Sequence, residues 1–592
     1  MSPGPVVWSK KRGRTIKRRE RVDDAHLEAY VENPVLRQIL ASRGVRDAVE
    51  LKCALADLLH YASLKNIDKA AEVIAAAVRE GEQILVAGDY DVDGLTGTAL
   101  GVKILRAFGA AKVSFSVPSR YEGGYGLSEE VVQRAISEGV KLIITVDNGI
   151  SCHQAAQSAL KAGIKLVITD HHECQSTLPQ AQAIVDPKQS GDQFPSSNLC
   201  GAGVLFYVLC AVRAVLRDSG WFERRSLPKL SDFLDLVALG TIGDVVPLDA
   251  NNRRLVKNGL MQIRQGRAQQ GILALARICR LSLPALTAHD VAFAMCPRLN
   301  APGRLKLQGA NPAIELLLCD DAQRALELAQ SLDMCNRRRG DFERVALREA
   351  LTAAKTQLGK QVVVLYGPQW LTGILGLIAG RVREQLNLPV FVFSGADEEG
   401  SELQGSGRSV PGCSLSDILG ELDEENPTLL VRYGGHAMAA GVSLLRENLE
   451  LFDELLCEKV AKAPRCGDDE LYTDGELPES CRNLEFACEL EEAGPWGSAF
   501  PEPVFDGTFV IRSAYLMTGR QGGKLLRLGL YTPSGASMQA VMYRASDEFA
   551  DLKEGMTVRL AYVLSVDRYM RNQRLEIVIK ELERVTDGNV AR

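Results

Sequence analysis

The chain has 592 residues, which is too long for a single hydrophobic core and predicts several domains. Hydrophobic residues make up 46% and charged residues 24%, and no uninterrupted apolar run approaches the ~20 residues that a membrane span requires. The formal net charge of −6 argues against a uniformly basic nucleic-acid-binding protein, although a basic groove is compatible with an acidic chain.

Cysteine spacing and the N-terminus both favour the cytoplasm. The 14 cysteines are scattered without CxxC pairs, which indicates reduced thiols rather than a zinc knuckle or a disulfide framework. Residues 1–50 are predicted to be an irregular, partly helical lead-in. Its basic run, from Lys10 to Arg21, lacks the apolar segment of a secretory signal. We interpret this run as a solvated tail, and contact with nucleic acid stays open as the alternative.

Residues 51–260 are predicted to form an α/β domain. Apolar runs at 84–86, 142–146 and 166–169 are typical of buried parallel strands, and helix-like stretches separate them. In such a sheet, the carboxyl ends of the strands meet at one edge, where ligands bind. The polar segments that follow these three strands are therefore expected to converge.

These segments have the composition of a metal site. Their candidate ligands are Asp89, Asp91, Asp93, Asp147, Asp170, His171 and His172, and a further apolar element, 234–243, ends at Asp244. The acids at 89, 91 and 93 alternate on an extended or looped segment, which is expected to turn them the same way, and Gly94 is expected to relieve crowding where a loop turns into the next helix. Carboxylate and imidazole ligands suit Mg²⁺, Mn²⁺ or Zn²⁺.

Simpler interpretations explain each of these segments alone. An acid before glycine is usually a turn, and the terminal glutamate of an EF-hand loop is missing. Their convergence in one sheet favours a hydrolytic site with two ions ~3.5–4 Å apart, which stabilise the attacking and leaving oxygens of a phosphodiester. Asp147 is the natural carboxylate to bridge the two ions.

Three further regions follow. Residues 261–355 are mainly helical, with one long connecting helix predicted within 320–357. Residues 356–465 repeat an α/β pattern, and 466–470 are a linker candidate. In residues 471–592, short alternating runs predict a small barrel or sandwich. The predicted elements are strands at 362–366 and 389–393, a helix at 374–385, and strands at 508–511, 525–530, 538–542 and 575–579.

From about residue 80 to the C-terminus, spaced motifs resemble the DHH phosphoesterase superfamily, and within it the bacterial single-strand-specific exonucleases. The motifs are Gly88–Gly94, Arg120–Glu122, Gly124–Leu127, Asp147–Gly149, Asp170–His172, Asp244–Leu248, Pro297–Ala301, Gly405–Ser409 and Gly434–Ala437. The resemblance implies a multi-domain α/β protein. A DHH parallel-sheet domain is joined by a long helix to a smaller DHH-associated α/β domain, and a C-terminal OB-type β-barrel follows.

The resemblance also implies an activity. Such proteins are 5′-to-3′ exonucleases that degrade single-stranded DNA to mononucleotides with Mn²⁺ or Mg²⁺, in DNA repair and recombination. They are expected to act as monomers beside single-strand-binding protein and a RecQ-type helicase. Carried over to this chain, Asp89, Asp91 and Asp147 hold one ion, and Asp93, Asp147, His171 and Asp244 hold the other. His172 faces the scissile phosphate, and Asp89 compensates for Ala87, where many superfamily phosphatases have a metal-binding histidine.

The DNA 5′ end is expected to be recognised between the two α/β domains. The candidate substrate-binding residues are Arg120, Tyr125, Arg298, Asn300, Arg304, Ser406, Gly407, Arg408 and His436. Backbone N–H groups of 405–407 and arginine forks suit phosphate. A glycine-rich turn with a solvent-facing arginine, and a partly buried His436, are the alternatives. In the barrel, Tyr515, Tyr543, Arg568, Tyr569, Arg571 and Arg574 suit sequence-independent binding of a single strand.

One departure and two other functions need weighing. Leu371 stands where related sequences usually carry a histidine after Trp370. A small-substrate phosphoesterase acting on short oligonucleotides or cyclic dinucleotides is the second candidate, but it needs no barrel. A non-catalytic DNA-binding protein is the third, but the expected metal ligands are all present.

Overall fold

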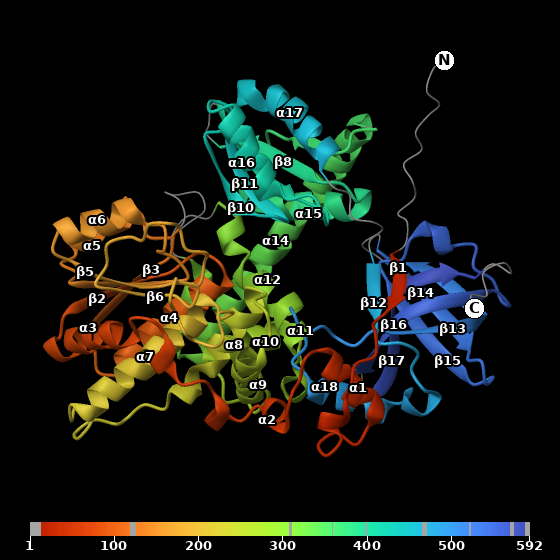
Figure 1. Ribbon diagram of the computed structural model, residues 1–592, viewed down its shortest axis with the longest axis horizontal. Helices are drawn as coiled ribbons and strands as arrows, with labels where there is room; N and C mark the ends of the chain where they lie inside the picture. Colours follow the sequence, from red (N-terminus) through yellow and green to blue (C-terminus); the bar gives the residue numbers. More distant parts are fainter. Residues whose placement is uncertain are drawn as a thin grey trace. The chain divides into compact units, whose positions relative to one another are not determined.

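The computed structural model describes residues 14–118, 126–306, 311–357, 359–396, 400–463, 470–519, 523–568 and 573–585. They fall into two compact units (Figure 1). The first unit contains Leu59–Val246 and Asn258–Gly467, and the second contains Arg12–Leu58, Pro247–Lys257 and Asp468–Arg592. None of the helices in the described part of the chain is both long and apolar enough to cross a membrane.

The first unit opens with a five-stranded parallel sheet in the order β3-β2-β4-β5-β6. Its strands are β2 (Gln83–Ala87), β3 (Lys112–Ser116), β4 (Leu142–Val146), β5 (Lys165–Thr169) and β6 (Ala183–Val185). The three strands predicted from apolar runs are thereby confirmed as β2, β4 and β5. Two further strands, β3 and β6, flank them.

Helices cover both faces of this sheet (Figure 1), which explains why its central strands are apolar throughout. They are α3 (Ile67–Glu80), α4 (Val92–Ala107) and α7 (Gly201–Asp218) on one side, and α5 (Glu129–Ser137) and α6 (His153–Lys161) on the other. Gly97 and Gly101 of α4 lie against Val146 and Val86, so the helix sits directly on the strands.

A helical region follows the sheet. Its longer helices are α8 (Leu234–Gly243), α9 (Ala250–Arg264), α10 (Gln270–Ile278), α13 (Pro312–Leu318) and α14 (Ala322–Ala354). The predicted long connecting helix is confirmed as α14, which has 33 residues. The apolar element before Asp244 is the helix α8, and almost all of its residues are buried because it packs against α4 and α7.

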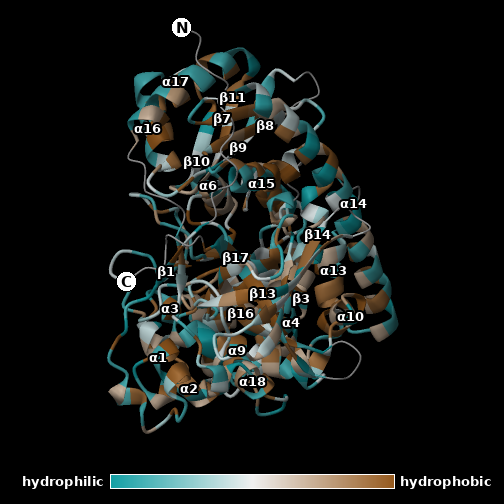
Figure 2. Cartoon of the chain, turned by 90° about the vertical axis from the view of Figure 1, so that its right-hand side faces the viewer, coloured by the Kyte–Doolittle hydropathy of each residue, from teal (hydrophilic) through white to brown (hydrophobic). Residues whose placement is uncertain are grey.

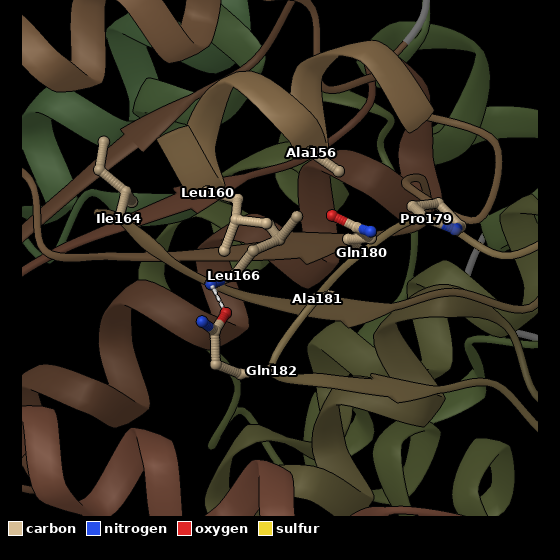
Figure 3. Close-up of a pocket in the computed structure, with 8 residues that line it drawn as sticks. All are labelled: Ala156, Leu160, Ile164, Leu166, Pro179, Gln180, Ala181 and Gln182. Carbon is tan, nitrogen blue, oxygen red and sulfur yellow. Dashed lines mark hydrogen bonds between the residues drawn. The ribbon is translucent and has the colours of Figure 1, made fainter. Parts of the chain in front are cut away.

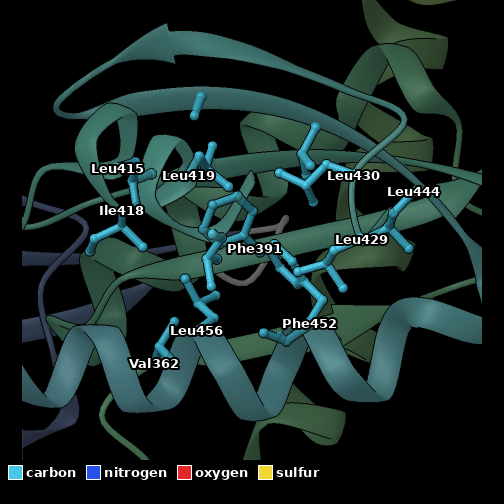
Figure 4. Packing of buried hydrophobic residues seen from close by; sticks show 14 of the residues in the cluster. Val362, Phe391, Leu415, Ile418, Leu419, Leu429, Leu430, Leu444, Phe452 and Leu456 are labelled. Atoms are coloured by element: carbon cyan, nitrogen blue, oxygen red, sulfur yellow. The ribbon is translucent and has the colours of Figure 1, made fainter. Parts of the chain in front are cut away.

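The second α/β domain has a mixed sheet in the order β10-β11-β9-β8-β7. Its elements are β7 (Val363–Tyr366), α15 (Leu375–Leu386), β8 (Val390–Gly395), β9 (Glu402–Arg408), α16 (Leu415–Glu425), β10 (Arg432–His436), β11 (Ala439–Leu445) and α17 (Leu449–Lys462). The predicted strands at 362–366 and 389–393 and the helix between them are confirmed. Much of α17 is hydrophilic (Figure 2). Its buried residue Phe452 packs against Phe391 of β8 in the core of this domain (Figure 4).

The second unit contains a closed barrel in the order β13-β14-β15-β17-β16. Its strands are β13 (Phe505–Thr518), β14 (Lys524–Tyr531), β15 (Ser537–Tyr543), β16 (Thr557–Asp567) and β17 (Arg574–Arg584). The predicted small barrel is confirmed, and β16 is a strand that the alternating pattern did not reveal.

The N-terminal lead-in belongs to the same unit as the barrel. Its strand β1 (Thr15–Arg18) pairs in parallel with β12 (Glu470–Thr473), and helices α1 (Pro34–Ser42), α2 (Ala48–Lys52) and α18 (Leu484–Ala493) complete the unit. Trp496 stacks on Phe500 at 5.0 Å between ring centres within this unit.

Candidate metal centre

The loop after β2 turns directly into a helix. Asp91 is the N-cap of α4, and its Oδ1 accepts hydrogen bonds from the backbone N–H groups of Asp93 (3.0 Å) and Gly94 (3.2 Å). The extended alternative for this segment is therefore wrong, because Asp93 already lies in the first helical turn, and the alternative of a loop that turns into a helix is confirmed. A Cβ on Gly94 would lie 2.5 Å from the backbone nitrogen of Asp89, so this close approach requires glycine.

Asp93 is held by the N-terminus of α7. Its Oδ2 accepts from the backbone N–H of Gly201 (2.5 Å) and its Oδ1 from that of Ala202 (3.0 Å). The positive end of the helix dipole stabilises a carboxylate at this position. A Cβ on Gly240 of α8 would lie 2.6 Å from Asp93 Oδ1, so the two helices can approach the acid only through small residues.

Histidine and carboxylates meet at the ends of β4, β5 and α8. His171 Nε2 lies 3.0 Å from Asp147 Oδ1, 3.6 Å from Asp244 Oδ2 and 3.8 Å from Asp93 Oδ2. Asp147 has a left-handed backbone with φ of 62°. Asp244 is the C-cap of α8, so the end of a helix places this acid beside the side chains that follow the strands β4 and β5.

Three groups of ligand atoms, each within 4.8 Å of one another, could hold metal ions among the described residues. They are Asp89, Asp91 and Asp147; Asp93, His171 and Asp244; and Asp147, His171 and His172. All six predicted ligands therefore converge, and Asp147 and His171 each belong to two groups.

The electrostatics of this centre fit divalent cations. Burial, and then the charge of Asp93, raise the pKa of Asp147 well above its usual value and that of Asp244 to about 8. Burial also raises the pKa of Asp93 to about 6, and burial with neighbouring His172 lowers the pKa of His171 to about 3. His171 could thus offer a neutral nitrogen to a metal ion. Five crowded carboxylates need positive charge from elsewhere, and oxygen-rich ligands suit Mn²⁺ or Mg²⁺.

His172 is held by a buried carboxylate. Asp170 Oδ1 accepts from His172 Nδ1 (2.7 Å) and from the backbone N–H groups of His171 and His172, while its Oδ2 accepts from Ile150 N (2.9 Å). Burial opposes the charge of His172, but the hydrogen bond to Asp170 raises its pKa to about 9. A protonated, half-buried imidazole beside the acids can therefore donate to a substrate oxygen.

The candidate phosphate contacts within the helical region are anchored to neighbouring elements. Arg298 donates from Nε to Asp333 of α14 (3.0 Å) and from Nη1 to the carbonyl of Ala294 (2.7 Å). Arg304 donates from Nη1 to the carbonyl of Gly373 (3.2 Å), and Asn300 ends the short helix α12 (Cys296–Leu299). Arg120 and Tyr125 lie outside the described residues.

The glycine-rich segment 405–407 is neither an exposed nest of N–H groups nor a turn. It lies in β9, which pairs with β8 on one side and β11 on the other, so its backbone is occupied by the sheet. Gly405 and Gly407 lie against the rings of Phe393 and Phe391, and a Cβ on either would be within 2.6 Å of them. Ser406 and Arg408 alternate with these glycines and therefore face the other side of the sheet.

His436 and Leu371 differ in exposure. The edge strand β10 is exposed along its whole length, so the alternative of a partly buried His436 is wrong. Leu371 is half-buried and packs against the apolar cluster formed by α14, α15 and β8.

In the barrel, the side chains of Tyr515 and Tyr543 are exposed, whereas Arg568 is paired with Glu491 at 2.6 Å. Tyr569 and Arg571 lie outside the described residues.

Two features of the first unit escaped the sequence analysis. Asp186 and Lys188 follow β6, a three-residue strand too short to stand out by its apolar pattern. A hollow of about 440 Å³ lies between α6 and the segment before β6 (Figure 3). Leu160, Ile164 and Leu166 line it, and it contains none of the predicted ligands, so the chemistry is not located there.

Comparisons with known proteins agree with this architecture. The family models for the DHH family N-terminal domain, the DHHA1 domain and the RecJ OB domain match residues 83–241, 346–462 and 473–581. The parallel-sheet domain, the second α/β domain and the barrel thus define a protein of the DHH class of phosphoesterases.

Related proteins and solved structures show to which family within this class the chain is similar. Single-stranded-DNA-specific exonuclease RecJ of Salmonella typhimurium is 41% identical over 97% of this chain and 99% of its own, and that of Escherichia coli is 40% identical over 96% and 98%. The crystal structure of RecJ in complex with Mn²⁺ from Thermus thermophilus matches with a TM-score of 0.80 and 30% identity, covering 97% of this chain and 80% of that one. The chain belongs to the RecJ family.

Proposed function

We propose that this protein is a single-stranded-DNA-specific 5′-to-3′ exonuclease that releases mononucleotides by hydrolysis with two Mn²⁺ or Mg²⁺ ions. The observation that carries the proposal is the convergence of Asp89, Asp91, Asp93, Asp147, Asp244 and His171 in a chain similar to RecJ exonucleases over nearly its whole length. Such an activity would serve DNA repair and recombination.

The proposed roles draw on these three ligand groups, which Asp147 and His171 connect. Asp89, Asp91 and Asp147 would hold one ion, and Asp93, Asp147, His171 and Asp244 would hold the other. When bound, the ions stabilise charge on the attacking and leaving oxygens. The protonated His172, oriented by Asp170, would donate a hydrogen bond to the scissile phosphate and assist departure of the leaving oxygen.

The outer face of the second sheet is proposed to bind the 5′ end of the strand. Ser406, Gly441 and Gly434 are cross-strand neighbours on β9, β11 and β10. A Cβ on Gly434 or Gly441 would meet no atom within 4 Å, so the glycines leave an open floor beside the polar side chains. Arg298, Asn300, Arg304, Ser406, Gly407, Arg408 and His436 remain the proposed contacts on this chain, together with Arg120 and Tyr125.

The barrel is proposed to bind the strand further along. Tyr515 on β13 and Tyr543 on β15 both present exposed rings, and Arg527 on β14 is the cross-strand neighbour of Tyr515. Aromatic stacking and phosphate neutralisation suit any base sequence. We propose domain limits of 51–260, 261–355, 356–465 and 471–592 after a lead-in of 1–50, and the family matches to the sheet domain and the barrel, which fall within these limits, support them.

Cellular context is part of the proposal. The enzyme would act as a monomer in the cytoplasm beside single-strand-binding protein and a RecQ-type helicase, which supply and protect single strands. No disulfide joins any cysteine in the described part of the chain, in keeping with reduced thiols.

The test compares strand substrates directly. Purified protein with Mn²⁺ is incubated with a long 5′-labelled single strand, the same strand labelled at its 3′ end, a blunt duplex and a labelled dinucleotide, with Asp147→Ala as control. Early release of labelled mononucleotide from the 5′-labelled strand alone, lost in the variant, is the expected result. Cleavage of the dinucleotide only would favour a small-substrate phosphoesterase, and binding without cleavage would favour a DNA-binding protein.

A further inference from the structure

A rigid turn follows the edge strand β6 at the carboxyl edge of the parallel sheet. Val185 pairs with Thr169 of β5, and the carbonyl of Val185 accepts from Asp170 N (3.1 Å). The turn 186–188 therefore lies beside the Asp170–His172 segment. Parallel strands present their carboxyl ends to the same edge, so this turn and the metal centre share it.

Asp186 fixes the backbone of this turn. Its side chain is fully buried, and its Oδ1 accepts from the backbone N–H of Lys188 at 2.8 Å. Gln189 closes the turn from the other side, because its Nε2 donates to the carbonyl of Ile184 at 2.9 Å. Lys188 therefore starts from a fixed point, although its own side chain is long.

The Lys188 ammonium pairs with the segment that carries His171 and His172. Its Nζ lies 3.1 Å from Oε1 of Glu173, the residue that follows His172, and its side chain is 30% exposed.

We propose that Lys188 binds a non-bridging phosphate oxygen of the DNA strand at the metal centre, and that Glu173 is its partner only while no strand is bound. This inference rests on the proposed nucleic-acid substrate and names one positioning residue for it. A lysine ammonium is a mobile point charge that suits a phosphate at the rim of a site.

Exchange of Glu173 for phosphate is inexpensive. The Glu173 side chain is 69% exposed, and an ion pair with one such solvent-screened partner is weak. The phosphate instead meets an ammonium that needs no change in the turn, because Asp186 already holds Lys188 in place. The strand therefore displaces a weak contact and forms a charge-assisted one.

The first test is the salt dependence of catalysis. In Lys188→Met, we expect KM for a 5′-phosphorylated single strand to rise roughly tenfold with kcat changed less than about twofold. The slope of log(kcat/KM) against log[KCl] should become shallower by about 0.7, the value for loss of one phosphate contact on a single strand. Lys165→Met is the matched control, because Lys165 pairs with Glu82 at 3.0 Å at the amino end of β5. Its slope should equal that of the unmodified protein.

Glu173→Gln separates a contact with DNA from a structural ion pair. If Glu173 competes with phosphate, Glu173→Gln lowers KM, opposite to Lys188→Met, and has no effect in the Lys188→Met background. If the pair only supports the fold, both variants lower the melting temperature and change KM in the same direction. Glu82→Gln controls for the general loss of one negative charge.

Three outcomes overturn the inference. They are an unchanged salt slope in Lys188→Met, a shared direction of the two KM changes, and a change only in the Mn²⁺ concentration required for activity. The unmodified protein is assayed alongside, so its own failure to cleave the strand would reject the proposed function instead.

Discussion

Two sets of buried carboxylates in the described part of the chain have opposite surroundings. In the second unit, Asp506 is fully buried and accepts from Arg18, Arg559 and Thr473 at 2.7–3.1 Å. Burial opposes its ionisation, but the hydrogen bond from Arg18 and the other contacts lower its pKa. At the metal centre, the carboxylates lie close to one another, and burial raises the pKa values of Asp93, Asp147 and Asp244.

The difference separates a structural carboxylate from a functional one. A buried charge is costly unless it is paired, and arginine supplies that pairing at Asp506. The metal centre leaves its negative charge to be balanced by ions that are not part of the chain. The same residue type therefore joins the N-terminal strand to the barrel in one unit and, in the other, forms a cluster that could hold cations.

The largest expected effect is the loss of activity in Asp147→Ala. Asp147 belongs to two ligand groups, so its removal should lower kcat by about 10³-fold or more, beyond the 10–100-fold typical of outer-shell partners. Single-turnover cleavage of a labelled strand measures this loss. Asp68→Ala on the exposed start of α3 is the control. Retention of more than a tenth of the activity would contradict the shared role of Asp147.

Asp506→Asn should instead damage stability and leave the chemical step intact. Removing one partner of a buried ion pair costs about 3–5 kcal/mol, because Arg18 and Arg559 lose their counter-charge. Calorimetry at pH 7 should show a lower transition for the second unit, with kcat on a short strand unchanged. Because the folded-state pKa is lowered, this contribution is present above the unfolded pKa and disappears as the pH falls through the folded one. A difference that persists at still lower pH would contradict the ion-pair explanation.

Ions should stabilise the first unit. Mn²⁺ at 100 times its dissociation constant should raise the free energy of unfolding by about 2.7 kcal/mol, since it binds only the folded centre. Differential scanning calorimetry with and without a chelator measures the shift. Asp147→Ala should lose most of it and Asp506→Asn should keep it. Equal shifts in both variants would show that the ion binds elsewhere.

Asp170→Asn should lower kcat by about 10–100-fold while KM stays nearly constant, because His172 loses the acceptor that orients it. The same substitution in a His172→Ala background should have no further effect on kcat. Independent, additive losses would mean that Asp170 acts through something other than His172.

The smallest expected effect concerns the open space beside Gly434 and Gly441 on the second sheet. Gly441→Val should raise KM for single-stranded DNA about fivefold, or about 1 kcal/mol, because the side chain fills the open space over β11. Valine suits a strand, so the fold should persist. Gly420→Ala, a helical glycine of α16 whose Cβ would also meet open space, is the control. An unchanged KM would show that the 5′ end does not bind at this face.

Much of the fold was predictable because local patterns carry it. The apolar runs of β2, β4 and β5 are buried on both faces, and α14 is a long stretch of strong helix formers, so periodicity and propensity agree with the structure. The second α/β pattern and the barrel were predictable in the same way. Strand β6 was not, because three residues contain too little periodicity.

The candidate site was predictable in composition but not in its local geometry. The acids at 89, 91 and 93 converge through a helix N-cap and not through strand alternation, since Asp91 caps α4. The glycines at 405 and 407 serve ring packing against Phe393 and Phe391 rather than exposure of N–H groups. In both places, a neighbouring element decided which backbone conformation the local residues adopt.

By itself, the sequence determined which side chains are available for the chemistry and which runs must be buried, because residue type and spacing are local properties. Only the tertiary structure decided that Asp244 reaches the centre from a helix end, that Gly201 and Ala202 hold Asp93, and that the N-terminal strand joins the barrel through Asp506. These contacts join residues that lie far apart in the chain. Their formation depends on packing of whole elements, which no local pattern specifies.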